Sequence, residues 1–182
     1  MERRTFLKGA AVLPTVGLDG FALAQATANG SVGGIHVVGE GQDRFGERHS
    51  LGYSTILFKT TPSETNGAAL VIEHVGLRGG GPPVHFHLYQ DEWFYVMEGQ
   101  VMFQVADTRK TLTAGESVLG PRGIPHGFCP VGEKPVRMLI AFTPAGKMEG
   151  FFRETAVPNG PKMTPELFAK YEMKYVGPPL VV

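Results

Sequence analysis

The stretch from Gly79 to Gly99, GGGPPVHFHLYQDEWFYVMEG, decides how this chain folds and what it can bind. In a β-strand, residues two apart point to the same face of the sheet. His85 and His87 can therefore converge on one ligand, while Phe86 between them packs on the opposite side. The alternation predicts a strand that presents a pair of imidazoles.

A carboxylate and a third imidazole complete the set. Glu92 has the wrong parity for the histidine strand, so we expect it to return on a partner strand after the bend at 88–91, as in an antiparallel hairpin. His126 follows a proline–glycine corner further along the chain. We therefore predict that three histidines and one glutamate meet at one point.

Imidazole and carboxylate donors suit one divalent first-row transition metal ion. The expected ions are Fe, Mn or Ni, with Co, Cu and Zn as alternatives. Four protein ligands leave one or two octahedral positions open for water, substrate or dioxygen, so chemistry at the ion is feasible. The competing interpretation is that these are core histidines whose nitrogens are satisfied by the protein.

The composition excludes several partners. The chain has 182 residues, a hydrophobic fraction of 42% and no formal net charge, which fits one globular domain with a substantial core. Its 17 basic and 17 acidic side chains are interspersed, so neither a nucleic-acid footprint nor an anionic-membrane patch is indicated. A small-molecule substrate is the expected partner. The single cysteine, Cys129, cannot form an intrachain disulfide.

Turn residues divide the chain into many short apolar bursts. The 25 glycines and 14 prolines act as punctuation and favour an all-β barrel or sandwich over long helices. The predicted strands are 35–38, 54–59, 69–75, 83–87, 92–98, 101–105, 110–112, 117–119, 126–128 and 136–142. Within 92–98, Trp93 and Tyr95 point away from Glu92, towards a second sheet or a dimer contact.

The C-terminal part has a different pattern. Residues 146–155 predict a short amphipathic helix, and Thr164-Pro165-Glu166 supplies the cap, first-turn proline and early acid of a second. Both helices should cap the barrel. The Gly177-Pro178-Pro179 tail cannot continue a helix and is expected to be extended, with a neighbouring subunit as one candidate contact.

The N-terminus resembles a Tat-type export signal. Arg3-Arg4-Thr5-Phe6-Leu7-Lys8 precedes an interrupted apolar run and the small-residue pattern Ala22-Leu23-Ala24. The run is too short and too broken to span a membrane. The resemblance implies a signal at 1–24, cleavage after Ala24, the Tat export machinery as a partner and a periplasmic or secreted protein.

Two spaced motifs are similar to the halves of the cupin signature. They read Gly79-x5-His85-x-His87-x4-Glu92-x6-Gly99 and Gly115-x5-Pro121-x-Gly123-x2-His126. Only the last position departs, where Pro130 replaces the usual Asn. The resemblance implies a double-stranded β-helix, the cupin jelly-roll barrel, over 35–145 after a flexible joint at 25–34, with a helical cap and tail at 146–182. It also implies that His85, His87, Glu92 and His126 hold the metal, and it suggests a homodimer.

Other side chains are assigned by the strand pattern alone. Phe94, Val96, Phe103 and Phe128 are the expected substrate-binding wall of the barrel, although core residues would look the same. His36, His49 and His74 lie outside the motifs and are taken as ordinary strand or surface histidines.

Cys129 is expected to be a packed thiol, and Arg122 a solvated corner residue that could steer an acidic substrate. The glycine run at 79–81 precedes a strand, so it is not a phosphate cradle.

The segments 79–87, 92–96 and 150–154 are similar to single-domain bacterial cupins of the quercetin 2,3-dioxygenase kind. That similarity implies a metal-dependent dioxygenase for a small aromatic or enolic molecule, with dioxygen as co-substrate and Glu92 as the catalytic proton acceptor. Two alternatives stay open. One is a non-oxidative isomerase, decarboxylase or sugar-processing enzyme with the same metal, and the other is a non-catalytic metal- or ligand-binding cupin.

Overall fold

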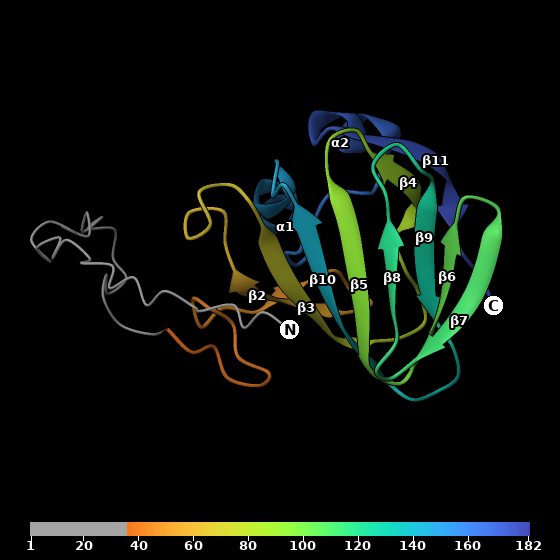
Figure 1. Ribbon diagram of the computed structural model, residues 1–182, viewed down its shortest axis with the longest axis horizontal. Coiled ribbons are helices and arrows are strands. Elements are labelled where there is room, and N and C mark those ends of the chain that lie inside the picture. Colours follow the sequence, from red (N-terminus) through yellow and green to blue (C-terminus); the bar gives the residue numbers. More distant parts are fainter. Residues whose placement is uncertain (1–35) are drawn as a thin grey trace, which may run out of the picture. The chain divides into compact units, whose positions relative to one another are not determined.

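The computed structural model describes residues 36–182, which form two antiparallel sheets and two short helices (Figure 1). The proposed signal at 1–24 and joint at 25–34 lie outside the described residues. The strand expected at 35–38 is wrong for its described part, because residues 36–38 are irregular. The all-β prediction is confirmed, and so are the short C-terminal helices.

One sheet has six strands in the order β1-β2-β3-β10-β5-β8, and the other has five in the order β11-β4-β9-β6-β7. Their bounds are β1 His49–Ser50, β2 Thr55–Thr60, β3 Leu70–Leu77, β4 Pro83–His87, β5 Asp91–Glu98, β6 Gln100–Val105, β7 Thr108–Thr113, β8 Ser117–Gly120, β9 His126–Pro130, β10 Val136–Thr143 and β11 Met173–Pro179. The strands from β2 to β10 match the predicted segments from 54–59 to 136–142 within about two residues.

Alternation of apolar side chains explains how the sheets pack. On β5, Glu92, Phe94 and Val96 are buried, while Trp93 is 40% exposed on the outer face. The inward residues of both sheets form one core, and their burial is the main stabilising contribution of the sandwich. Its largest fully buried side chains include Phe58, Phe94, Phe142, Ile72 and Ile140.

One expectation about strand pairing is wrong. β4 and β5 do not form a hairpin, because they belong to different sheets. Glu92 therefore faces the histidine pair across the interior of the sandwich. The C-terminal tail is extended as expected, and it pairs antiparallel with β4 of its own chain, with Tyr175 opposite His85. β11 is the edge strand of this sheet, so contact with a neighbouring subunit stays a prediction.

Helices α1 (Met148–Thr155) and α2 (Pro165–Lys170) follow β10 and precede β11. α1 buries Met148, Phe151 and Phe152. α2 begins as predicted, because the Thr164 hydroxyl accepts a hydrogen bond from the Leu167 amide at 3.3 Å and Pro165 occupies the first turn. Within residues 36–182, neither helix has the length and apolarity that crossing a membrane requires.

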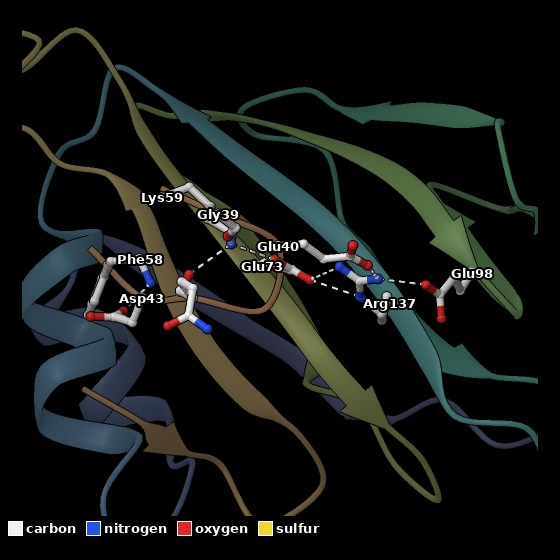
Figure 2. A network of polar contacts seen from close by, with 9 residues as sticks. Gly39, Glu40, Asp43, Phe58, Lys59, Glu73, Glu98 and Arg137 are labelled. Atoms are coloured by element: carbon white, nitrogen blue, oxygen red, sulfur yellow. Dashed lines mark hydrogen bonds and ion pairs between the residues drawn. The ribbon is translucent and has the colours of Figure 1, made fainter. Parts of the chain in front are cut away.

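A buried ion network crosses the six-stranded sheet (Figure 2). Glu73 on β3 is only 1% exposed and accepts hydrogen bonds from Arg137 Nε and Nη2 at 3.0 and 2.8 Å. Lys59 Nζ lies 2.8 Å from its other oxygen. Arg137 also bonds Glu40, and Lys59 bonds the Gly39 carbonyl, so the network fastens the segment at 39–40 to the sheet.

Candidate metal centre

Four side chains meet between the two sheets. His85 and His126 are register partners on β4 and β9, and His87 lies two residues further on the same face of β4. Glu92 comes from β5 on the other sheet, and its Oε2 lies 3.0 Å from His87 Nε2 and 2.9 Å from His126 Nε2. One donor atom from each residue lies within 4.8 Å of every other. All four residues are buried.

Backbone carbonyls orient two of the imidazoles. His85 Nδ1 lies 2.7 Å from the Pro83 carbonyl oxygen, and His126 Nδ1 lies 2.9 Å from that of Ile124. A carbonyl oxygen can only accept, so each Nδ1 carries a proton and donates it. In the neutral ring, Nε2 then presents a lone pair to the centre, which is the form that binds a metal.

The contact between His126 and Glu92 favours a cation at this point. The Nε2 lone pair of a neutral His126 faces a carboxylate oxygen at 2.9 Å, and two lone pairs repel unless a proton or a metal ion lies between them. His87 Nδ1 is buried and has no hydrogen-bond partner within residues 36–182. The donor set therefore fits a first-row transition metal ion.

Burial sets the charge states of the centre. Burial, reinforced by the neighbouring His126 and His87, lowers the pKa of His85 to about 3, so this imidazole is neutral at pH 7. Burial alone would raise the pKa of Glu92, but when His126 and His87 carry a proton on Nε2 their hydrogen bonds outweigh burial and hold that pKa below its usual value. His85 is thus neutral and Glu92 ionised.

Two glycines make room for this arrangement. A Cβ on Gly120, the β8 partner of Glu92, would lie 2.9 Å from His126 Nδ1. A Cβ on Gly81 would lie 1.9 Å from the Phe128 carbonyl oxygen, where the start of β4 approaches β9. The glycine run before β4 therefore permits a close backbone approach, and the corner before His126 needs a residue with no side chain.

An apolar cavity opens onto the centre. Its lining residues are Leu51, Tyr53, His74, Pro82, His85, His87, Glu92, Phe128, Ile140, Phe142, Met148, Phe151, Phe152, Met163, Phe168 and Met173. Helices α1 and α2 thus supply part of the wall. Aromatic rings lie directly beside the imidazoles, with Phe168 5.1 Å from His85 and Phe142 5.6 Å from His87 between ring centroids.

Only one of the four residues predicted to form the substrate-binding wall lines the cavity. Phe128 lines this cavity, whereas Phe94, Val96 and Phe103 lie in the core and are not among its lining residues. Phe94 packs 6.1 Å from the His126 ring and supports it from behind. Phe103 lines a second cavity between β6, β7 and β8.

Sequence reasoning missed two polar residues of the cavity. His74 is 2% exposed and Tyr53 packs against the core, and both line the cavity beside Glu92. His74 shares the inward face of β3 with Ile72, so the parity of that strand was the available signal. Tyr53 lies in the irregular segment before β2, where no periodicity could place it.

Three other residues discussed from the sequence, Arg122, Cys129 and His49, make contacts away from the candidate metal centre. Arg122 donates from Nε and Nη2 to Asp91 at 3.0 and 2.7 Å, and these hydrogen bonds lower the pKa of Asp91 to about 2. Cys129 is a buried free thiol that packs with Val84 and Leu180. His49 lies 3.0 Å from Glu47, outside the cavity lining.

Residues 74–142 match the family model described as Cupin domain. The matched residues run from His74 on β3 to Phe142 on β10 and include all four candidate ligands. No curated protein matches the chain.

Solved structures share the fold. An RmlC-like cupin from Shewanella frigidimarina is 26% identical, with a TM-score of 0.49 and 57% of this chain and 87% of that chain covered. KdgF from Halomonas sp. is 18% identical, with a TM-score of 0.48 and coverages of 54% and 86%. A variant of Streptomyces PAC13 solved with uridine is 14% identical, with a TM-score of 0.50 and coverages of 72% and 84%. The similarity to PAC13, at 14% identity, is one of fold alone.

Proposed function

We propose that this chain is a metal-dependent oxidoreductase of the dioxygenase type that acts on a small aromatic or enolic molecule. The main supporting observation is that three imidazoles and one carboxylate meet at one point, and that three of these residues, His85, His87 and Glu92, line a cavity walled by phenylalanine and methionine side chains. Open apolar cavities with a few convergent polar groups are typical of small-molecule sites.

The metal would be held by His85, His87, Glu92 and His126, and Fe, Mn or Ni suits these donors best. When bound, it would supply Lewis acidity and a redox-active partner for dioxygen. The neutral state of His85 and the ionised state of Glu92 favour binding, since metal ligands must be deprotonated.

Glu92 is the proposed proton acceptor. Its Oε2 faces His87 and His126, whereas Oε1 has no hydrogen-bond partner within residues 36–182. A phenolic or enolic hydroxyl in the cavity would give its proton to this carboxylate, so the substrate O–H bond breaks as the carboxyl O–H bond forms. The resulting anion is electron-rich at carbon, and dioxygen is the oxidant that adds to it.

The aromatic wall would orient a flat substrate. Phe142 and Phe168 lie beside the candidate ligand rings, and Phe151 and Phe152 from α1 extend the wall. Aromatic side chains bury a flat ring favourably and exclude water from the reacting carbon. The two helices therefore act as part of the substrate site in this proposal.

Export is proposed from the sequence at 1–24, which places the working protein in the periplasm or outside the cell. Tat export carries folded proteins, so the metal would be acquired in the cytoplasm, where copper is scarce and cannot displace weaker-binding ions. A homodimer through the outer face of the six-stranded sheet is also proposed. Trp93 and its register partner Leu119 are 40% and 49% exposed there.

The test combines elemental analysis with an oxygen electrode. Protein matured through its own export route is assayed against flavonols, catechols and β-diketones, with and without dioxygen. Substrate-dependent oxygen uptake supports the proposal. Turnover under nitrogen would instead support a non-oxidative isomerase or decarboxylase. Tight retention of unchanged ligand under either gas would support a binding protein, and both results overturn the dioxygenase assignment.

A further inference from the structure

The cavity has a second polar wall, separate from the four candidate ligands. Tyr53 precedes β2, and His74 projects inward from β3. Ser54, which is 6% exposed, follows Tyr53 in sequence and contacts His74, but it does not line the cavity itself. The motif at 79–99 does not include this wall, and the proposed function gives it no role.

A hydrogen bond fixes the orientation of His74. Its Nδ1 lies 2.9 Å from Ser54 Oγ, and no other partner of the Ser54 hydroxyl is found within residues 36–182. A buried hydroxyl needs an acceptor for its proton. The Ser54 hydroxyl therefore donates to Nδ1, and the proton of the neutral ring resides on His74 Nε2, where it can be donated in turn.

Both donors belong to side chains that line the cavity. Within residues 36–182, the only fully buried side-chain polar atoms with no partner are His87 Nδ1 and Gln90 Oε1. His74 Nε2 and the Tyr53 hydroxyl have no hydrogen-bond partner there either. A molecule in the cavity could therefore accept a hydrogen bond from each of them.

Neither donor is charged near neutral pH. Burial lowers the pKa of His74 to about 4, against a smaller opposing effect of Glu92, so the imidazole is neutral. Burial and the charge of Glu92 raise the pKa of Tyr53, so the phenol retains its proton. The His74 N–H can only donate, and the Tyr53 O–H has a proton to donate, so together they suit an oxygen that accepts two hydrogen bonds, such as a carbonyl or an enolate oxygen.

We propose that Tyr53 and His74 form an oxygen-binding subsite that selects substrates carrying a carbonyl oxygen in addition to the hydroxyl that faces Glu92. The substrate class is thus a hydroxylated aromatic or enolic ketone. The proposal rests on the proposed function in taking this cavity as the substrate site. A site built to donate to one oxygen discriminates against an analogue that lacks it, because the donors are then left unpaired.

The test uses matched ligands that differ in that oxygen alone. The three hydroxyacetophenone isomers and the corresponding ethylphenols are titrated calorimetrically into the full-length protein under nitrogen, with metal content measured in parallel. We expect at least one ketone to bind about tenfold more tightly than its ethyl counterpart. Tyr53→Phe and His74→Phe should each reduce that ratio at least about threefold, and His74→Gln, which keeps a donor, should restore part of it.

Matched controls are Tyr175→Phe on β11 and His49→Gln on β1, which lie outside the cavity lining. Both should keep the ratio of the unsubstituted protein. If His74→Phe does not fold, Tyr53→Phe decides, because it removes a single oxygen atom. The proposal is overturned if no ketone is preferred, or if the preference persists in Tyr53→Phe. A ketone preference without oxygen uptake would refute the dioxygenase and leave this subsite standing.

Discussion

His126 Nε2 lies 2.9 Å from Glu92 Oε2, although 34 residues separate the two in sequence and they belong to different sheets. The contact joins β9 to β5 across the interior of the sandwich. Because His126 donates its Nδ1 proton to the Ile124 carbonyl, this contact needs either a second proton on the ring or a metal ion between the two side chains. That requirement connects the fold to the proposed chemistry.

Substitution of Glu92 by Gln should separate catalysis from metal binding. The amide keeps the size of the side chain and one oxygen donor but cannot accept the substrate proton. We expect turnover to fall by about 10²- to 10⁴-fold while part of the metal stays bound. Steady-state kinetics and elemental analysis on the same preparation check this. A variant that loses its metal but keeps its rate would refute the proton-transfer role.

Gly120→Ala should disturb the centre without disrupting the sheets. The new methyl group would lie 2.9 Å from His126 Nδ1 and must displace that ring. We expect a drop of about tenfold or more in metal affinity, as for changes that disturb the support of a metal ligand, while the circular dichroism spectrum is retained. Gly177→Ala is the matched control, since its Cβ meets nothing within 4 Å. Equal metal affinity in the two variants would contradict the steric argument.

Arg137→Met should destabilise the protein more than Arg122→Ala. Removing Arg137 leaves Glu73, which is 1% exposed, with Lys59 as its remaining charged partner. Leaving a buried charge without any partner costs about 3–5 kcal/mol, and Lys59 offsets part of that cost here, whereas an exposed pair contributes much less. The pair between Arg122 and Asp91 is of the exposed kind. Urea unfolding measures both, and a smaller loss for Arg137→Met would contradict the importance of the network.

Stability should depend on pH through His74. Its pKa in the folded chain is about 4, below the ordinary 6.5, so between these values the unfolded chain binds a proton that the folded chain does not. Stability therefore falls as pH is lowered from 6.5 towards 4. Between pH 6.5 and pH 5 the loss from this residue is on the order of 2 kcal/mol.

The comparison of His74→Phe with the unsubstituted protein isolates this effect. The variant should show a shallower decline in the free energy of unfolding over that range, since other titrating groups contribute equally to both. His49→Gln should follow the unsubstituted protein. Identical pH profiles for His74→Phe and the unsubstituted protein would show that His74 is not held neutral by burial.

Strand periodicity predicted most of the fold. The alternation in 92–98 and 136–142 predicted β5 and β10, and the Thr164-Pro165 pair predicted the start of α2. Periodicity could not assign strands to sheets. A short bend between β4 and β5 is typical of a hairpin, but here the chain crosses between sheets, and β4 pairs with β9 and with β11 at the far end of the chain.

The candidate ligands were predictable because their spacing is local to two motifs. The cavity wall was less predictable from the sequence, because it depends on which side chains of α1 and α2 line the cavity. Phe151 and Phe168 line the cavity, whereas Phe94 and Phe103 lie in the core. His74 was assigned no role because it lies outside the motifs, although its parity on β3 pointed inward.

The most direct test of the central claim is the metal content of the protein purified after its own export, measured by elemental analysis. We predict one divalent transition metal ion per chain, retained through gel filtration and lost in a variant that carries His85→Ala and His126→Ala. Protein that is reproducibly metal-free, and that takes up no ion from solutions of Fe, Mn or Ni, would contradict the account.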